Sequence, residues 1–290
     1  MRIKLIIILL TIMSLNFSCS TPPKNPGDVY DMRKQAEAQL ALGNRQADRG
    51  GFDTALVILD EAMRLAIVAD DPSLRIRAGL SRGNVLFALG RGDEAEKAWN
   101  DALGEAERAG NSGLAAVSRI HIARGKLLSA GGAADAQSVR DEVDRNLAQI
   151  KNDRYYTAFA WTIIGLAEKE LGRYAPAETA VRRALEIHDK DLFFELAAYD
   201  WFMIASFRSL SGNYRGALEA LETAAAFDRR VENSWGLASD WRAMGDVHRK
   251  AGSGEASRAA YRRAAEIFQA MGNSEAAAQA LSRAENGQKP

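Results

Sequence analysis

The chain has 290 residues but a single cysteine, Cys19, and only three histidines. One cysteine excludes an internal disulfide, so its thiol is free, joined to another molecule or modified. Metal sites usually combine several His and Cys ligands at short spacing, whereas His121, His188 and His248 share no such spacing and lie in no HExxH motif. The sequence therefore predicts no metal site and no disulfide-stabilised domain.

An excess of either charge is also absent, because 38 Lys and Arg residues stand against 38 Asp and Glu residues. Proteins that bind nucleic acid through its phosphates carry a basic excess or a basic stripe. We therefore expect no nucleic-acid partner, whereas a balanced charge is compatible with protein partners.

Motifs for catalysis or cofactor binding are missing too. The segment GRGDEA, Gly90 to Ala95, formally matches the dinucleotide pattern GxGxxA, but that pattern has meaning only after a strand in a βαβ unit. No serine stands in a GxSxG setting. The sequence predicts neither an enzyme nor a bound cofactor.

One hydrophobic run is present near the start, from Leu5 to Met13, and it follows Arg2 and Lys4. It is too short for a membrane span, which needs about 20 apolar residues. A basic start and a short apolar run are typical of a bacterial secretory signal. The stretch STPPKNPGD behind Cys19 contains three prolines and no apolar periodicity, which favours a flexible tether.

A cysteine between such a run and a tether resembles the processing site of bacterial lipoproteins. The resemblance implies that residues 1–18 are a signal peptide that is removed, that Cys19 is acylated, and that residues 19–32 form the tether. Ser20, rather than an aspartate, follows the cysteine, which implies the outer membrane, facing the periplasm. The alternative is ordinary cleavage after Ser20, which would leave a soluble mature chain.

The rest of the chain repeats with a period of 40 residues, and two residues are inserted between the second and fourth repeats. Each repeat contains a small residue, a bulky apolar residue four positions later and an alanine three positions after that. Offsets of four and seven return to the same side of a helix. The pattern occurs at Ala55, Leu59, Ala62; Ala95, Trp99, Ala102; Ala177, Val181, Ala184; Ala217, Leu221, Ala224; and Ser257, Tyr261, Ala264.

These segments, each preceded by a glycine-containing turn and a further helix, resemble tetratricopeptide repeats. The residues that match the family pattern best are Trp161, Gly165, Gly172, Tyr174, Ala177, Ala184 and Leu185. The resemblance implies an all-α fold, a right-handed superhelical solenoid of antiparallel helix pairs. We expect the repeat domain over residues 33–286, with a tail at 287–290. Six repeats are expected, at 33–70, 74–110, 114–151, 155–190, 193–230 and 234–271, followed by a capping helix in SEAAAQALSRAEN.

The third repeat departs most from this pattern. Gly125 and Gly132 fit it, but His121 stands at the tryptophan position, and the following helix has lost the small-residue spacing by one place. We expect a shifted or bent helix pair there.

In such a solenoid the first helix of each pair lines the concave face, where partners bind. The repeat phase predicts a partner-binding groove formed by Arg77, Asn84, Phe87, Arg119, Lys126, Phe159, Lys169, Tyr199, Phe202, Arg242 and Arg249. Aromatic side chains among arginines and lysines suit an extended peptide or a helix with apolar anchors and acidic flanks. The family's clamp for a chaperone's terminal carboxylate is not predicted, because Leu40 and Leu80 occupy its basic sites.

The sequence thus predicts a membrane-anchored scaffold of the bacterial cell envelope that binds a peptide segment or helix of another envelope protein. The alternative is a periplasmic component that binds a small ligand and works with a transporter. An open groove favours the scaffold, whereas an enclosed apolar cavity lined by Phe159, Tyr199 and Phe202 favours the small ligand.

Overall fold

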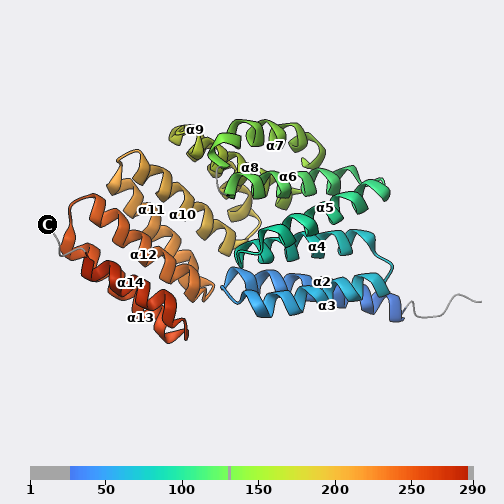
Figure 1. Cartoon of the computed structure of the whole chain (residues 1–290), viewed down its shortest axis with the longest axis horizontal. Helices are drawn as coiled ribbons and strands as arrows, with labels where there is room; N and C mark the ends of the chain where they lie inside the picture. Colours follow the sequence, from blue (N-terminus) through green and yellow to red (C-terminus); the bar gives the residue numbers. More distant parts are fainter. Residues whose placement is uncertain (1–26, 130–131, 287–290) are drawn as a thin grey trace, which may run out of the picture.

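The computed structural model describes residues 27–129 and 132–286, which form helices joined by short turns (Figure 1). No strand occurs in these two ranges, and Cys19 lies outside them. The helices are α2 (Gly27–Asp48), α3 (Phe52–Val68), α4 (Pro72–Ala88), α5 (Gly92–Arg108), α6 (Ser112–Leu128), α7 (Ala136–Ile150), α8 (Arg154–Glu170), α9 (Tyr174–Lys190), α10 (Phe194–Leu210), α11 (Tyr214–Arg230), α12 (Ser234–Lys250), α13 (Gly254–Ala270) and α14 (Ser274–Asn286), with a 3-10 turn, η1 (Gly132–Asp135), before α7.

Most of the helices end in the same three-residue turn. Between α8 and α9, Gly172 has a φ of 71° and the Arg173 N–H donates to the Glu168 carbonyl at 2.8 Å, which closes the helix end. Leu192 takes the same left-handed conformation, with a φ of 62°, although side chains disfavour it. Because the turn recurs, α3 to α6 and α8 to α13 all contain 17 residues.

Consecutive helices pack in antiparallel pairs, and the pairs stack into a right-handed superhelical solenoid. The pairs are α2 with α3, α4 with α5, α6 with α7, α8 with α9, α10 with α11, and α12 with α13, and α14 packs on α13. In Figure 1 the stack curves so that the blue helices α2 and α3 lie beside the ends of α10 and α12. The predicted all-α solenoid of six helix pairs and a capping helix is confirmed.

Glycines in the first helices let the second helices come close. A Cβ atom on Gly165 would lie 2.5 Å from a methyl carbon of Val181, and one on Gly245 would lie 2.7 Å from the Tyr261 ring. Gly83 meets the indole of Trp99 in the same way. In each case the bulky residue follows the glycine by 16 positions, so the motif found in the sequence is the contact that joins the two helices of a pair.

The third pair is built differently from its neighbours. Its second helix, α7, has 15 residues and follows η1, whereas other pairs have a direct three-residue turn. A Cβ atom on Gly125 would meet Trp99 of α5, so this glycine serves the contact with the preceding pair. The first residues of α4 and α6 are 40 apart and those of α6 and α8 are 42 apart, so the two inserted residues follow the start of α6.

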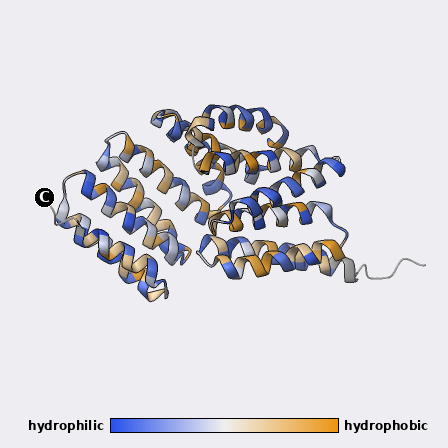
Figure 2. Ribbon diagram, viewed as in Figure 1, coloured by the Kyte–Doolittle hydropathy of each residue, from blue (hydrophilic) through white to orange (hydrophobic). Residues whose placement is uncertain are grey.

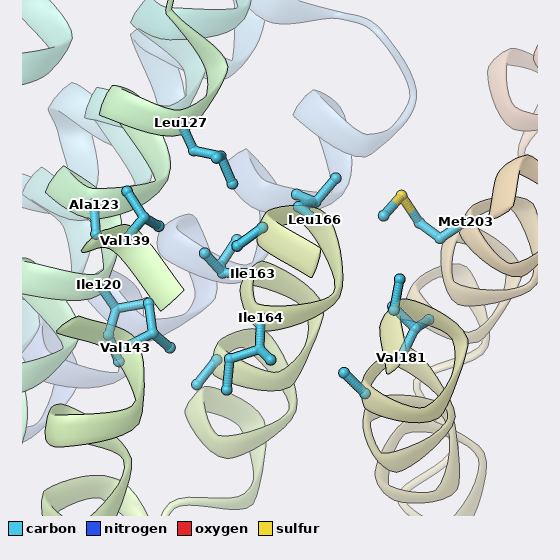
Figure 3. Close-up of a cluster of buried hydrophobic side chains, with 14 of the residues drawn as sticks. Ile120, Ala123, Leu127, Val139, Val143, Ile163, Ile164, Leu166, Val181 and Met203 are labelled. Carbon is cyan, nitrogen blue, oxygen red and sulfur yellow. The ribbon is translucent and has the colours of Figure 1, made fainter. Parts of the chain in front are cut away.

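The hydrophobic core runs through the stack rather than lying in one place, and apolar residues are distributed over every helix pair (Figure 2). At the third and fourth pairs, Ile120 and Leu127 of α6 lie beside Val139 of α7 and Ile163 of α8 (Figure 3). Each pair therefore buries its apolar surface against the next, as expected for a solenoid.

Candidate functional site

The curvature of the solenoid brings its first pair into contact with its last two. The ring of Phe52, at the start of α3, meets the ring of Trp235 in α12 edge-on, with centroids 6.3 Å apart. The Arg49 guanidinium donates to the Val231 carbonyl at 3.3 Å. These contacts join residues 182 or more positions apart in the chain, and the first helices of the pairs face one another inside the closed curve.

We call the surface of these first helices that carries Asp48, Arg77, Arg124, Tyr155 and Tyr199 the inner face. Tyr155 is 41% exposed and Tyr199 is 47% exposed, so a partner can reach both phenol groups. Arg77 of α4 is hydrogen bonded to Tyr156 of α8, next to Tyr155. The helices around Tyr155 raise its pKa by desolvation, and the negative charge of Asp48 raises it further.

At one end of the inner face two carboxyl groups lie near each other. Desolvation and the neighbouring Glu195 raise the pKa of Asp48 to about 7, although solvent still reaches this side chain. Arg49 lowers the Asp48 pKa and lies 4.0 Å from the Glu195 carboxylate. The negative charge at this end is therefore close to the residues that close the solenoid.

Further along the inner face, polar and aromatic groups of three successive first helices form one line. Nδ1 of His121 lies 2.9 Å from Oδ1 of Asn84, and its ring stacks on Phe159 with centroids 4.5 Å apart. Burial, with a contribution from Arg124, lowers the pKa of His121 to about 3. The imidazole is therefore neutral at physiological pH and donates to Asn84.

Arg124 stands beside this line and has no acidic partner among the described residues. Its Nη1 atom is buried and makes no hydrogen bond there. The guanidinium carbon lies 5.9 Å from the centre of the Phe87 ring, and Tyr199 of α10 is its electrostatic neighbour. Burial lowers the pKa of Arg124.

The predicted groove residues are distributed over several environments. Arg77 and Tyr199 lie on the inner face, and Phe87 and Phe159 are partly buried there against Trp99 and His121. Phe202 lines a hollow between α10 and α12, together with Ser206, Asp246 and Lys250. Others contact their neighbours: Arg119 pairs with Glu107, Lys169 with Glu170 and Arg249 with Asp246, Arg242 lies 5.9 Å from the Phe268 ring, and Lys126 is exposed.

Arg124 is the inner-face residue that sequence reasoning missed. The thirteenth residue of α4 is Asn84, and the thirteenth residue of α6 is Arg124. The sequence analysis had placed the two inserted residues before α6, which put Lys126 at this position. Counting 40 residues onward from Asn84 would have found Arg124.

Sequence reasoning also missed two buried ionisable pairs at equivalent places in successive repeats. Nδ1 of His188 lies 2.6 Å from Oδ2 of Asp200. Forty residues later, Asp228 and Asp240 are hydrogen bonded to each other, and the Asn233 amide donates to Oδ1 of Asp228 at 2.9 Å. Desolvation raises the pKa of Asp228 to about 6 and that of Asp240 to about 9, so the two carboxyl groups share a proton at neutral pH.

The described residues contain no group of three or more His, Cys, Asp or Glu side chains arranged to bind a metal ion. Within 27–129 and 132–286, every helix is too short or too polar to cross a bilayer.

Comparison with known proteins supports the repeat architecture. Residues 160–191 match the tetratricopeptide repeat family. This tetratricopeptide repeat includes most of α8, the turn at Gly172 and α9. No curated protein matches the chain.

Solved structures with the same fold have low sequence identity. A Rap protein complexed with competence and sporulation factor has a TM-score of 0.60 and 16% identity, over 88% of this chain and 75% of that one. BtubC from P. vanneervenii has a TM-score of 0.55 and 17% identity, over 82% and 92% of the two chains. PilW, a type IV pilus biogenesis factor, has a TM-score of 0.50 and 17% identity, over 85% and 98%. At these identities the similarity shows a shared tetratricopeptide-like fold.

Proposed function

We propose that this protein is a protein–protein interaction scaffold that binds a peptide segment or helix of a partner on its inner face. The observation that carries the proposal is the pair of exposed tyrosines, Tyr155 and Tyr199, on a curved surface that also carries Arg77 and Arg124. Tyrosine and arginine are the side chains that most often dominate binding energy at interfaces. The Rap protein with this fold was solved in complex with competence and sporulation factor, which is compatible with a ligand on such a surface.

We further propose that the scaffold works in the bacterial cell envelope. Removal of residues 1–18 and acylation of Cys19 would attach the chain to a membrane, and the segment 19–32 would hold the solenoid away from the lipid. Stable anchoring needs two membrane signals, and the acyl chains of a lipoprotein exceed that number. We place the protein at the outer membrane, facing the periplasm, with another envelope protein as its partner and with no catalytic role.

The competing proposal, a small ligand shared with a transporter, would need an apolar cavity around Phe159, Tyr199 and Phe202. Phe159 is instead stacked on His121, while Phe202 lines a separate hollow between α10 and α12. Two of the three residues expected in one cavity are thus used in different places. This distribution favours an extended partner over a small enclosed ligand.

Site-specific crosslinking in the native host tests the scaffold. A photoreactive phenylalanine analogue at Tyr199 should form a discrete crosslinked product with an envelope protein. The same analogue at Val57, which is 71% exposed on α3, is the control and should not. Identical products from both positions, or none from either, would contradict inner-face binding. The intact mass of the purified protein beside a Cys19→Ser variant checks the anchor separately, since only the former should carry acyl chains.

A further inference from the structure

We propose that Arg124 is the binding site for a carboxylate group of the partner peptide. The inference rests on the proposed scaffold function and names the chemistry by which the inner face recognises its ligand. The carboxylate is either the carboxyl terminus of the peptide or an Asp or Glu side chain within it.

The first argument is the state of the Arg124 charge. A buried charge is costly unless it is paired and hydrogen bonded. Nη1 of Arg124 is buried without a hydrogen-bond partner, and no salt bridge among the described residues includes this side chain. His121, its closest ionisable neighbour on α6, is neutral at physiological pH because its pKa is about 3.

Other partly buried arginines of the solenoid show what is missing at Arg124. Nε of Arg140 donates to Glu168 at 2.8 Å. Arg208 donates from Nη2 to Glu178 at 2.8 Å and from Nη1 to the Gly216 carbonyl at 3.1 Å. Arginines that serve the fold therefore have partners within it, whereas the guanidinium of Arg124 faces aromatic rings.

The surroundings of Arg124 indicate the kind of anion that fits. A guanidinium binds a carboxylate through two parallel hydrogen bonds, and one arginine balances the single charge of a carboxylate. Phe87 on one side and Tyr199 on the other supply apolar surface, and Tyr199 is 47% exposed. The negative groups of the inner face, Asp48 and Glu195, are associated with Arg49 at the closure of the solenoid. A carboxylate beside an apolar side chain of a peptide matches this site.

Selection from synthetic peptides tests the proposal on the full chain in mild detergent. The probe is a mixture of random octapeptides in three pools: free carboxyl terminus without Asp or Glu, amidated terminus with Asp and Glu, and amidated terminus without either. Immobilised wild type should enrich one or both acidic pools over the third. Arg124→Gln should lose about tenfold or more of this enrichment, because a hydrogen bond to a charged group contributes about 1.5–3 kcal/mol.

The control is Arg145→Gln, which removes an exposed arginine of α7 that pairs with Glu142. It should enrich the same peptides as wild type. Equal enrichment by Arg124→Gln and wild type, or equal enrichment of all three pools, would overturn the carboxylate site and leave the scaffold intact. Enrichment of no peptide by any variant would contradict the scaffold as well.

Thermal unfolding without peptide separates binding from folding. Arg124→Gln removes an unpaired charge, so its Tm should equal or exceed that of wild type by about 2–4 °C. Arg208→Gln breaks the pair with Glu178 and should lower the Tm. A fall in Tm for Arg124→Gln as large as that for Arg208→Gln would assign Arg124 to the fold and overturn the proposal.

Discussion

At the scale of single residues, the solenoid places ionisable groups where other repeats have small ones. The pair Asp228 and Asp240 occupies the positions that Ala66 and Ala78 occupy in the first two repeats, 162 residues earlier in each case. Both aspartates are almost fully buried, at 3% and 1% exposure. The last two repeats therefore depend on a shared proton where the first two use hydrocarbon contact.

This pair makes stability depend on pH. The raised pKa values, about 6 and about 9, mean that the folded chain binds more protons than the unfolded chain, so unfolding becomes easier as pH rises through these values. Asp240→Asn keeps the shape and stays neutral. We expect it to exceed wild type in free energy of unfolding by about 1–3 kcal/mol at pH 9 and to differ little at pH 5.

Urea unfolding at the two pH values measures this difference, with Asp93→Asn on the exposed first turn of α5 as control. Glu195 and Arg229 also act electrostatically on the pair, and both remain in the variant. An equal loss of stability between pH 5 and pH 9 in wild type and Asp240→Asn would show that the pair does not titrate as described.

The residue scale is also where sequence reasoning was weakest. Arg77 and Tyr199 could be placed on the inner face because their helices follow the repeat. Arg124 could not, because the position of two inserted residues decides which side chain faces inward. Its lack of a partner depends on groups from α4 and α10, more than 35 residues away in either direction, and no local pattern records that.

At the scale of helices, the joint within each pair is a glycine against a bulky side chain, and one substitution has opposite signs at two glycines. Gly83→Ala would push a methyl group into the Trp99 indole, which donates from Nε1 to the Leu80 carbonyl at 3.3 Å. Overpacking of this kind costs about 1–3 kcal/mol. Gly104→Ala on α5 meets only the flexible end of Arg108 at 3.4 Å and should stabilise the helix by up to about 1 kcal/mol.

Chemical denaturation of both variants beside wild type measures the two changes, and each variant is the control for the other. If both alanines shifted the free energy of unfolding in the same direction, helix propensity alone would explain them and the packing argument at Gly83 would be wrong.

Most of the helical architecture could be predicted because the turns and joints are local. A glycine turn followed by small and bulky residues at offsets of four and seven marks the second helix in five pairs. The third pair has η1 and a longer connection, and its Gly125 contacts the preceding pair, so the same letters serve another contact there. Spacing alone does not distinguish these two uses of a glycine.

At the scale of the whole molecule, curvature decides what the inner face can hold. Each pair contributes a similar rotation, and after five pairs the turn between α2 and α3 meets α12. No single repeat specifies this contact, so it was outside the reach of sequence reasoning. Closure brings Asp48 toward Glu195 and sets the space open to a partner on the inner face.

The closing contact can be removed without touching the joints between neighbouring pairs. Arg49→Ala with Phe52→Ala deletes the hydrogen bond to Val231 and the ring contact with Trp235, while α3 keeps its other packing in the first pair. We expect the radius of gyration in small-angle X-ray scattering to rise, because nothing else described here ties the first pair to the last. Arg91→Ala, in the equivalent turn between α4 and α5, is the control and should leave the scattering unchanged. An unchanged radius in the double variant would mean that the stacked pairs alone fix the curvature, and partner entry would then require no opening of the solenoid.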